Sequence, residues 1–270
     1  MLFKSDVMSQ SLPLYQIDAF TDRVFGGNPA AVCPLDNWLA KGVMQAIALE
    51  NNLSETAFFV VRDDGDFDIR WFTPATEIAL AGHPTLAAAW LVLNRLQPDR
   101  EQVRFHSMAG DVLEVVGDGD LLVMDFPARP PVPIVIPGGF EAAIGVAPVE
   151  LLQGVYNMAV LETADQVAGL DPDMGFIEAV DGVGLICTAP GKDCDFVSHF
   201  FAPDMGIPED PVTGSAHCTL IPYWAARLGK DKLHARQVSA RGGELFCQSI
   251  SARVKMAGHA VLYMEGRIDL

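Results

Sequence analysis

The feature that most constrains the fold of this chain is a partial internal repeat. Residues 68–74, which read Asp-Ile-Arg-Trp-Phe-Thr-Pro, resemble residues 197–203, which read Val-Ser-His-Phe-Phe-Ala-Pro. Each segment leads within about a dozen residues to a glycine, Gly82 or Gly214, that is expected to open a helix carrying a tryptophan. Both halves therefore contain, in the same order, a strand, a Phe-x-Pro sequence, an acidic loop, a glycine, a helix and a tryptophan. This shared order indicates a duplication. Because two copies are too few for a solenoid, the repeat predicts a pseudo-symmetric pair of lobes, whose interface would favour a ligand site.

A cluster of prolines marks the expected boundary between these lobes. Residues 127–137 contain five prolines, which is typical of an extended connector. We therefore expect an N-terminal lobe over residues 1–126, completed by a C-terminal strand at about 262–270, and a C-terminal lobe over 127–261. Beyond the connector, residues 141–144 and 149–153 suggest a short helical region.

Composition and net charge limit the classes of partner that this protein can bind and the cellular compartment in which it is expected. The net charge of −17 argues against a nucleic-acid or anionic-membrane partner, and no apolar run approaches the ~20 residues of a membrane helix. Residues 1–12 lack the apolar centre of a secretory signal and are expected to form a frayed tail. The five cysteines contain no CxxC pair, which fits a reducing compartment better than a disulfide framework. We expect a cytoplasmic protein.

Neither a metal nor a nucleotide cofactor is indicated. The six histidines are scattered without an HxxxH pair, so a structural zinc is disfavoured. The Gly-Gly pairs of the chain lack the spacing of a Walker or Rossmann motif.

The two glycines that open the repeated helices have a physical use. The first turn of a helix presents unpaired backbone N–H groups and the positive end of the helix dipole, and a glycine lets a ligand approach it closely. If the duplication makes Gly82 and Gly214 face each other, the cleft holds two sets of donors for a carboxylate or enolate oxygen. Either glycine alone is better explained as an ordinary turn glycine. The matched pair favours a site.

Ser54 and Glu55 form a polar pair between apolar neighbours. A leucine precedes them and the apolar run at 57–59 follows. Such surroundings partly desolvate a carboxylate, which raises its pKa toward the range useful for proton transfer. The pattern fits a loop glutamate that caps a backbone amide equally well, and Glu50 and Glu77 are competing candidates.

Further polar groups stand at or before the helix starts. His83 directly follows Gly82, where the positive helix end favours a neutral imidazole that can accept or donate a hydrogen bond. Asp210 is the corresponding polar group of the second half, and Ser215 follows Gly214. Taken alone, Asp210 is better explained as a turn or cap residue before a proline, and Ser215 also fits an ordinary helix-start serine.

Together these segments resemble a known family. Their order and spacing are similar to those of the PhzF-like phenazine-biosynthesis isomerases, which share the diaminopimelate-epimerase fold. The matching motifs are QIDAFT at 16–21, GNPAAV at 27–32, NLSETAF at 52–58, WFTP at 71–74, GHPTL at 82–86 and EDPVTGSA at 209–216.

The resemblance implies an α+β fold and a set of roles. Each lobe would be a curled mixed or antiparallel sheet around a central helix, with the active site between the lobes. Glu55 would be the proton shuttle, with His83 and Asp210 assisting proton movement. We expect Ser54, Gly82, Gly214 and Ser215 to bind substrate. The resemblance implies this role for Ser215, and the paired helix starts indicate it for Gly82 and Gly214. The family's member in phenazine synthesis acts on a small carboxylate without a cofactor, and members commonly form homodimers; we expect the same here.

The placement of cysteine separates the two branches of this fold. The epimerase branch has one cysteine at each helix start, whereas here Ala81 precedes Gly82 and residues 210–215 contain no cysteine. Cys218 lies about one turn inside its helix. The sequence therefore favours a cofactor-independent isomerase that moves a proton between carbons of a small carboxylate-bearing substrate. The alternatives are an amino-acid racemase or epimerase with non-cysteine bases, and a non-catalytic ligand-binding member of the family.

Overall fold

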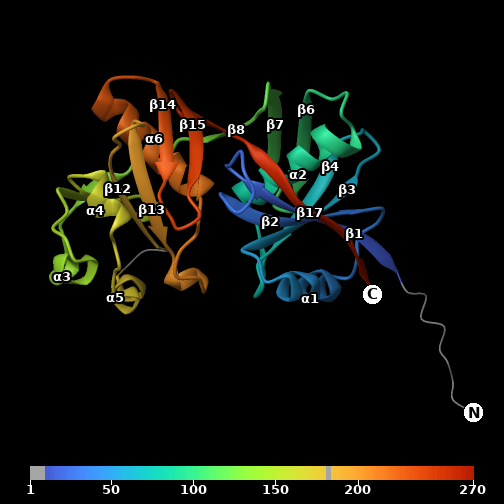
Figure 1. The fold of residues 1–270 in the computed structure, drawn as a ribbon, viewed down its shortest axis with the longest axis horizontal. Coiled ribbons are helices and arrows are strands. Elements are labelled where there is room, and N and C mark those ends of the chain that lie inside the picture. The colour runs from blue at the N-terminus through green and yellow to red at the C-terminus, as the bar shows by residue number, and fades with distance from the viewer. Residues whose placement is uncertain (1–9, 181–183) are drawn as a thin grey trace, which may run out of the picture.

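The computed structural model describes residues 10–180 and 184–270, which form two lobes lying side by side (Figure 1). The first lobe is built around helix α2 and the second around helix α6. The strands of the first half of the chain are β1 (Ser11–Ala19), β2 (Asn28–Leu35), β3 (Glu55–Val61), β4 (Phe67–Phe72), β5 (Glu77–Ile78), β6 (Gln102–Ser107), β7 (Val112–Asp118) and β8 (Leu121–Pro127). Those of the second half are β9 (Val132–Ile134), β10 (Glu150–Gln153), β11 (Asn157–Val160), β12 (Leu185–Pro190), β13 (Phe196–Phe201), β14 (Lys232–Gln237), β15 (Gly243–Ile250), β16 (Arg253–Gly258) and β17 (Ala260–Asp269).

The helices fill the connections between strands. The α-helices are α1 (Lys41–Asn51), α2 (Gly82–Leu91), α3 (Phe140–Ile144), α4 (Ala164–Ala168), α5 (Met174–Ala179) and α6 (Gly214–Leu228). A π-helical turn, η1 (Val92–Leu96), continues α2, and a 3-10 turn, η2 (Pro203–Met205), precedes α6. Among the described residues, no helix has the length and apolar character needed to cross a membrane.

The strand pairing repeats between the lobes. The first ladder runs β17-β1-β2-β3-β4-β6-β7-β8 and the second runs β9-β10-β11-β12-β13-β14-β15-β16. The pairs β2–β3 and β4–β6 are parallel, as are their counterparts β11–β12 and β13–β14, and the other matched pairs are antiparallel. An antiparallel pairing of β8 with β16 joins the ladders into one continuous, curled sheet. The sequence repeat thus reflects a duplicated eight-strand unit.

A contact between a basic side chain and a glutamate is also shared by the two repeats. In the first lobe Arg70 Nε lies 2.7 Å from a carboxylate oxygen of Glu77. In the second lobe His199 occupies the position aligned with Arg70, and its Nδ1 lies 2.8 Å from Glu209 Oε1. Each contact joins a strand, β4 or β13, to the segment that leads toward the central helix.

The central helices are apolar on nearly all sides, which suits them to the interior of a curled sheet. In α2 the side chains of Leu86 and Leu91 are fully buried, and each such burial contributes roughly 2 kcal/mol. In α6 the repeat's tryptophan, Trp224, is fully buried and its indole N–H donates to Thr188 Oγ1 at 2.9 Å. The aligned Trp90 of α2 is only half-buried.

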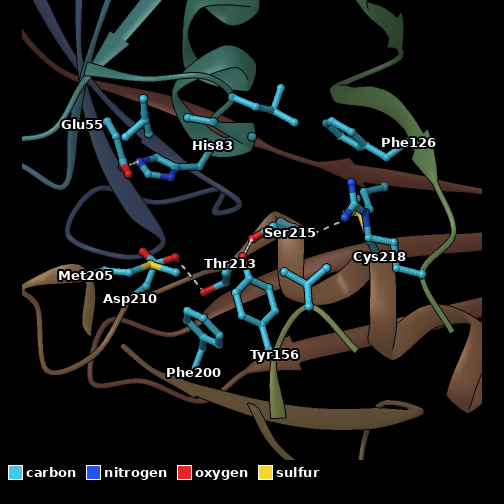
Figure 2. Close-up of a pocket in the computed structure, with 18 of the residues that line it drawn as sticks. Glu55, His83, Phe126, Tyr156, Phe200, Met205, Asp210, Thr213, Ser215 and Cys218 are labelled. Carbon is cyan, nitrogen blue, oxygen red and sulfur yellow. Dashed lines mark hydrogen bonds and ion pairs between the residues drawn. The ribbon is translucent and has the colours of Figure 1, made fainter. Parts of the chain in front are cut away.

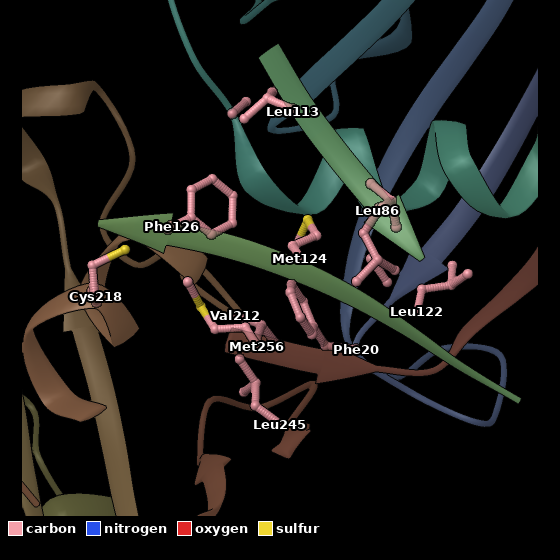
Figure 3. Close-up of a cluster of buried hydrophobic side chains, with 14 of the residues drawn as sticks. Phe20, Leu86, Leu113, Leu122, Met124, Phe126, Val212, Cys218, Leu245 and Met256 are labelled. Carbon is pink, nitrogen blue, oxygen red and sulfur yellow. The ribbon is translucent and has the colours of Figure 1, made fainter. Parts of the chain in front are cut away.

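The buried core continues from one lobe into the other. Strand β8 passes between the lobes, with Met124 and Phe126 packed among side chains of both (Figure 3). Leu86 of α2 and Cys218 of α6 belong to the same cluster of buried apolar side chains. The relative position of the two helix starts is therefore fixed by a shared core.

We propose that the lobes divide at the proline-rich connector, with residues 1–126 and the C-terminal strand in one lobe and residues 127–261 in the other. The pairing of β17 with β1 supports this division, because it places the end of the chain in the first ladder. The matching strand of the second ladder is β9, which lies within the proline-rich connector.

Two local expectations were wrong. Residues 11–12 lie in strand β1, where Ser11 pairs with Asp269, instead of in a frayed tail; residues 1–9 of that prediction lie outside the described residues. Residues 150–153 form strand β10 and not a helix. Four residues are too few to show a period, and pairing with β11 decides the outcome.

Candidate active site

A cavity of about 460 Å³ opens between the two lobes (Figure 2). Its wall includes the starts of both central helices, the end of β8 and the connector. The predicted site residues in its lining are Glu55, Gly82, His83, Asp210, Gly214 and Ser215. Apolar and aromatic side chains complete it, among them Ile78, Leu80, Phe126, Val155, Phe200, Met205 and Met256.

The helix starts of α2 and α6 face each other. A methyl group built on Gly82 would lie 3.8 Å from the Cα of Gly214, and one built on Gly214 would lie 3.9 Å from the Cα of Gly82. Neither N-cap side chain bonds to its helix start. These are ordinary contact distances, so the two helix starts lie directly opposite each other, and both sets of first-turn N–H groups lie beside the cavity.

Glu55 lies at the first residue of β3 and points into the cavity toward His83 (Figure 2). Its Oε2 atom is buried, 3.2 Å from His83 Nε2, without the geometry of a hydrogen bond. Burial raises the pKa of Glu55 from 4.5 to about 8, with a further contribution from the nearby charge of Asp210. The carboxyl is therefore mainly protonated at neutral pH.

His83 is buried at the start of α2, with a side-chain exposure of 6%. Burial lowers its pKa to about 3, against the opposing effect of a backbone hydrogen bond with Pro29. Because Glu55 is protonated and His83 is neutral near pH 7, their contact is between two uncharged groups.

Asp210 belongs to the second lobe and lies on the same side of the cavity as Glu55 (Figure 2). Its Oδ1 accepts a hydrogen bond from Asn28 Nδ2 at 2.6 Å and its Oδ2 accepts one from Thr213 Oγ1 at 2.7 Å. Burial raises the pKa of Asp210 to about 6, although both hydrogen bonds oppose the rise. The cavity therefore holds one ionised and one protonated carboxyl at neutral pH, an arrangement suited to acid–base chemistry.

Asn28 connects the two halves of this site and was missed as a site residue from the sequence. Its fully buried amide lies in β2 of the first lobe, yet it reaches Asp210 and the carbonyl oxygen of Val212, 3.0 Å away, in the second. Its Oδ1 accepts a hydrogen bond from Ser54 at 3.0 Å. Ser54 therefore lies behind Asn28 and is not among the lining residues. The Gly-Asn-Pro motif was the available signal, but it also fits a simple turn.

The far side of the cavity carries a second polar group. Tyr156 Oη and Ser215 Oγ lie 2.8 Å apart, and Arg129 lines the cavity nearby. Cys218 lies one turn into α6, where burial raises the pKa of its thiol to about 11. Tyr156 and Arg129 stand on a loop and on the connector, so neither the repeat nor a helix start marked them.

The competing glutamates lie elsewhere. Glu50 is exposed on α1. Glu77 binds Arg70 and Lys41, and these partners lower its pKa to about 2. Within residues 10–180 and 184–270, no three or more His, Cys, Asp and Glu side chains are grouped as a metal site would require.

Comparison with solved structures defines the class of protein. A hydroxyproline epimerase from Agrobacterium vitis superposes with a TM-score of 0.62 at 11% identity, covering 96% of this chain and 93% of its own, and shares the fold alone. A PhzF-family phenazine biosynthesis protein from Enterococcus faecalis superposes with a TM-score of 0.94 at 45% identity, covering 97% of this chain and all of its own. The molecule has the two-lobed, epimerase-like fold.

The family follows from the sequence. The model of the phenazine biosynthesis-like protein family, PhzC-PhzF, matches residues 17–135 and 142–266. The chain belongs to this family. An uncharacterised isomerase of Pseudomonas aeruginosa is 50% identical over 260 residues, covering 96% of this chain and 99% of its own. The chain is an enzyme of the isomerase class.

Proposed function

We propose that this isomerase works without a cofactor and that Glu55 takes a proton from one carbon of a small carboxylate-bearing substrate and returns it to another. The observation that carries the proposal is a buried carboxyl whose pKa is raised to about 8 beside a neutral His83. A base is most effective when its pKa lies near the working pH, because it then combines basicity with a usable ionised fraction. A minor fraction of Glu55 is ionised at neutral pH and can act as the base.

The reaction begins with ionised Glu55 and balances without a further reagent. The carboxylate takes a proton from a carbon next to a π system, and the electron pair of the broken C–H bond enters that π system. First-turn N–H groups at Gly82 and Gly214 stabilise the developing negative charge. The O–H of Glu55 then gives the proton to a second carbon, which forms the new C–H bond and restores the carboxylate.

Asp210 and His83 support this cycle in different ways. The negative charge of Asp210 favours the protonated form of Glu55 and so increases its basicity. Neutral His83 keeps contact with the Glu55 carboxyl without adding a charge that would lower the basicity.

A second candidate is a racemase or epimerase with two non-cysteine bases. It is favoured by the presence of Glu55 and Asp210 in one cavity, with pKa values of about 8 and about 6. A two-thiol mechanism is disfavoured, because Cys218 is the lining cysteine and burial raises its pKa to about 11. Deuterium from D₂O at the α-carbon of an inverted amino acid would support this candidate.

The cellular location and the oligomeric state of the enzyme are also proposals. A cytoplasmic location is supported by its five cysteines, each of which is a free thiol. A homodimer is supported by the family resemblance, and light scattering of the purified protein tests it.

The test of the main proposal is turnover of unsaturated carboxylic acids in D₂O, followed by NMR and mass spectrometry. Wild-type protein is expected to move a double bond or a label in at least one acid, whereas Glu55→Gln loses turnover with its fold intact. Glu50→Gln is the matched control, since Glu50 is exposed on α1. Wild-type activity in Glu55→Gln would refute the role of Glu55. If the wild-type protein binds these acids but converts none of them, it is a ligand-binding protein and not an isomerase of this kind.

A further inference from the structure

Arg129 is the one permanent cation among the described residues that line the cavity. In the described part of the chain, no carboxylate lies within ion-pair distance of its guanidinium, unlike those of Arg241 and Arg253, which pair with Asp18 and Asp125. A guanidinium left unpaired at the edge of an enzyme cavity is available to a ligand.

The backbone around Arg129 is fixed to the second lobe. The N–H of Arg129 donates to the carbonyl oxygen of Cys218 at 2.8 Å, and the N–H of Ala128 donates to that of Ala252 at 2.9 Å. Because Cys218 lies in the first turns of α6, the connector is held beside that helix start. The side chain of Arg129 therefore enters the cavity from a defined position.

The charge of Arg129 acts on the far side of the cavity. Its positive charge opposes the rise that burial causes in the pKa of Cys218 and of Tyr156, so the guanidinium lies near both. Figure 2 shows these two side chains on the side away from Glu55. The cavity is thus polarised, with carboxyl groups on one side and a cation on the other.

An anionic substrate needs such a cation. The chain has a net charge of −17, and Asp210 adds a negative charge inside the cavity, so a carboxylate is otherwise repelled. A guanidinium binds a carboxylate through two parallel hydrogen bonds and so fixes its orientation as well as its position. The apolar body of the substrate would then pack on side chains such as Phe126 and Phe200.

We propose that Arg129 is the carboxylate-binding and specificity-determining residue of this cavity, which takes small monocarboxylic acids with an apolar body. The carboxylate lies at Arg129 and the remainder of the molecule extends toward Glu55. The orientation toward Glu55 rests on the proposed isomerase function, whereas anion binding by Arg129 does not.

Binding of benzoate and of its uncharged analogue benzamide, measured by calorimetry, tests this proposal. Wild-type protein is expected to prefer benzoate by about tenfold or more, as charged hydrogen bonds commonly provide. Arg129→Gln loses the preference, Arg129→Lys retains part of it, and Arg253→Gln, an arginine paired outside the cavity, behaves as wild type. Arg129 is exposed in the ligand-free cavity, so its replacement leaves folding unaffected, which circular dichroism checks.

Two results would overturn the proposal. One is equal benzoate affinity in Arg129→Gln and wild type, and the other is no preference of the wild type for benzoate at concentrations up to ~10 mM. Turnover separates this proposal from the isomerase proposal. If Glu55→Gln is inactive but Arg129→Gln keeps the wild-type KM, only the role of Arg129 is refuted. If Arg129→Gln no longer binds benzoate but Glu55→Gln is still active, only the role of Glu55 is refuted.

Discussion

Replacing Glu55 by glutamine is expected to stabilise the protein at alkaline pH. The pKa of Glu55 in the folded protein is about 8, above the ordinary value of 4.5, so folding is favoured by protonation. That contribution is complete below pH 4.5 and is lost as the pH rises to about 8. The difference between these two pKa values corresponds to at most about 5 kcal/mol in the free energy of unfolding. Because the cavity admits water, we expect about 2–4 kcal/mol. Glutamine has nearly the same shape and no charge to desolvate.

Urea unfolding of wild type and Glu55→Gln at about pH 5 and about pH 9 measures this effect. The two proteins should differ by less than about 1 kcal/mol in free energy of unfolding at the lower pH, and the variant should be the more stable by about 2–4 kcal/mol at the higher pH. Glu50→Gln, on the exposed face of α1, should show no such change. If the difference between wild type and Glu55→Gln is the same at both pH values, Glu55 is not desolvated and the reasoning is refuted.

Three further predictions follow from the site. Asn28→Ala removes the buried amide that joins the lobes and should lower the free energy of unfolding, measured in urea, by about 2–4 kcal/mol. The control Asn94→Ala, at an exposed position, should change it by less than about 0.5 kcal/mol. An equal loss in both variants would contradict the role of Asn28 in joining the lobes. Cys218→Ala should keep turnover, and iodoacetamide should not label Cys218 at neutral pH because its pKa is about 11; rapid labelling would argue for a thiolate. The value of kcat/KM should rise with pH to a plateau above about 8, because ionised Glu55 takes the proton; a fall over that range would make Glu55 the initial acid.

The duplication was the most informative sequence feature, because it concerns the order of elements and not their details. It predicted two lobes and a matched pair of helix starts, and the structure contains both. The repeated ladder order, and the β8–β16 pairing that joins the ladders, could not be predicted. Long-range register depends on which strand edges meet, and a local hydrophobic pattern does not specify that.

Within the site, the sequence marked residues next to a recognisable motif and missed those that the fold brings in from elsewhere. Their neighbours or a nearby helix start made Glu55, His83 and Asp210 candidates, and the resemblance to the PhzF-like family gave them their roles. Arg129 stands on the connector, where an arginine among prolines fits a solvated face, and only the backbone contact with Cys218 places it at the cavity. Ser54 shows the opposite case, since its motif pointed to the site but its hydroxyl bonds to Asn28.

The most direct test of the account is the titration of the Glu55 carboxyl itself. In protein labelled with ¹³C at the glutamate side-chain carboxyl, the resonance absent from Glu55→Gln identifies this group, and its shift with pH gives the pKa. We predict a value near 8 in the wild type and a lower value in Asp210→Asn, because the charge of Asp210 raises the pKa of Glu55. A value near the ordinary 4.5 would contradict the claim that this cavity prepares Glu55 for proton transfer.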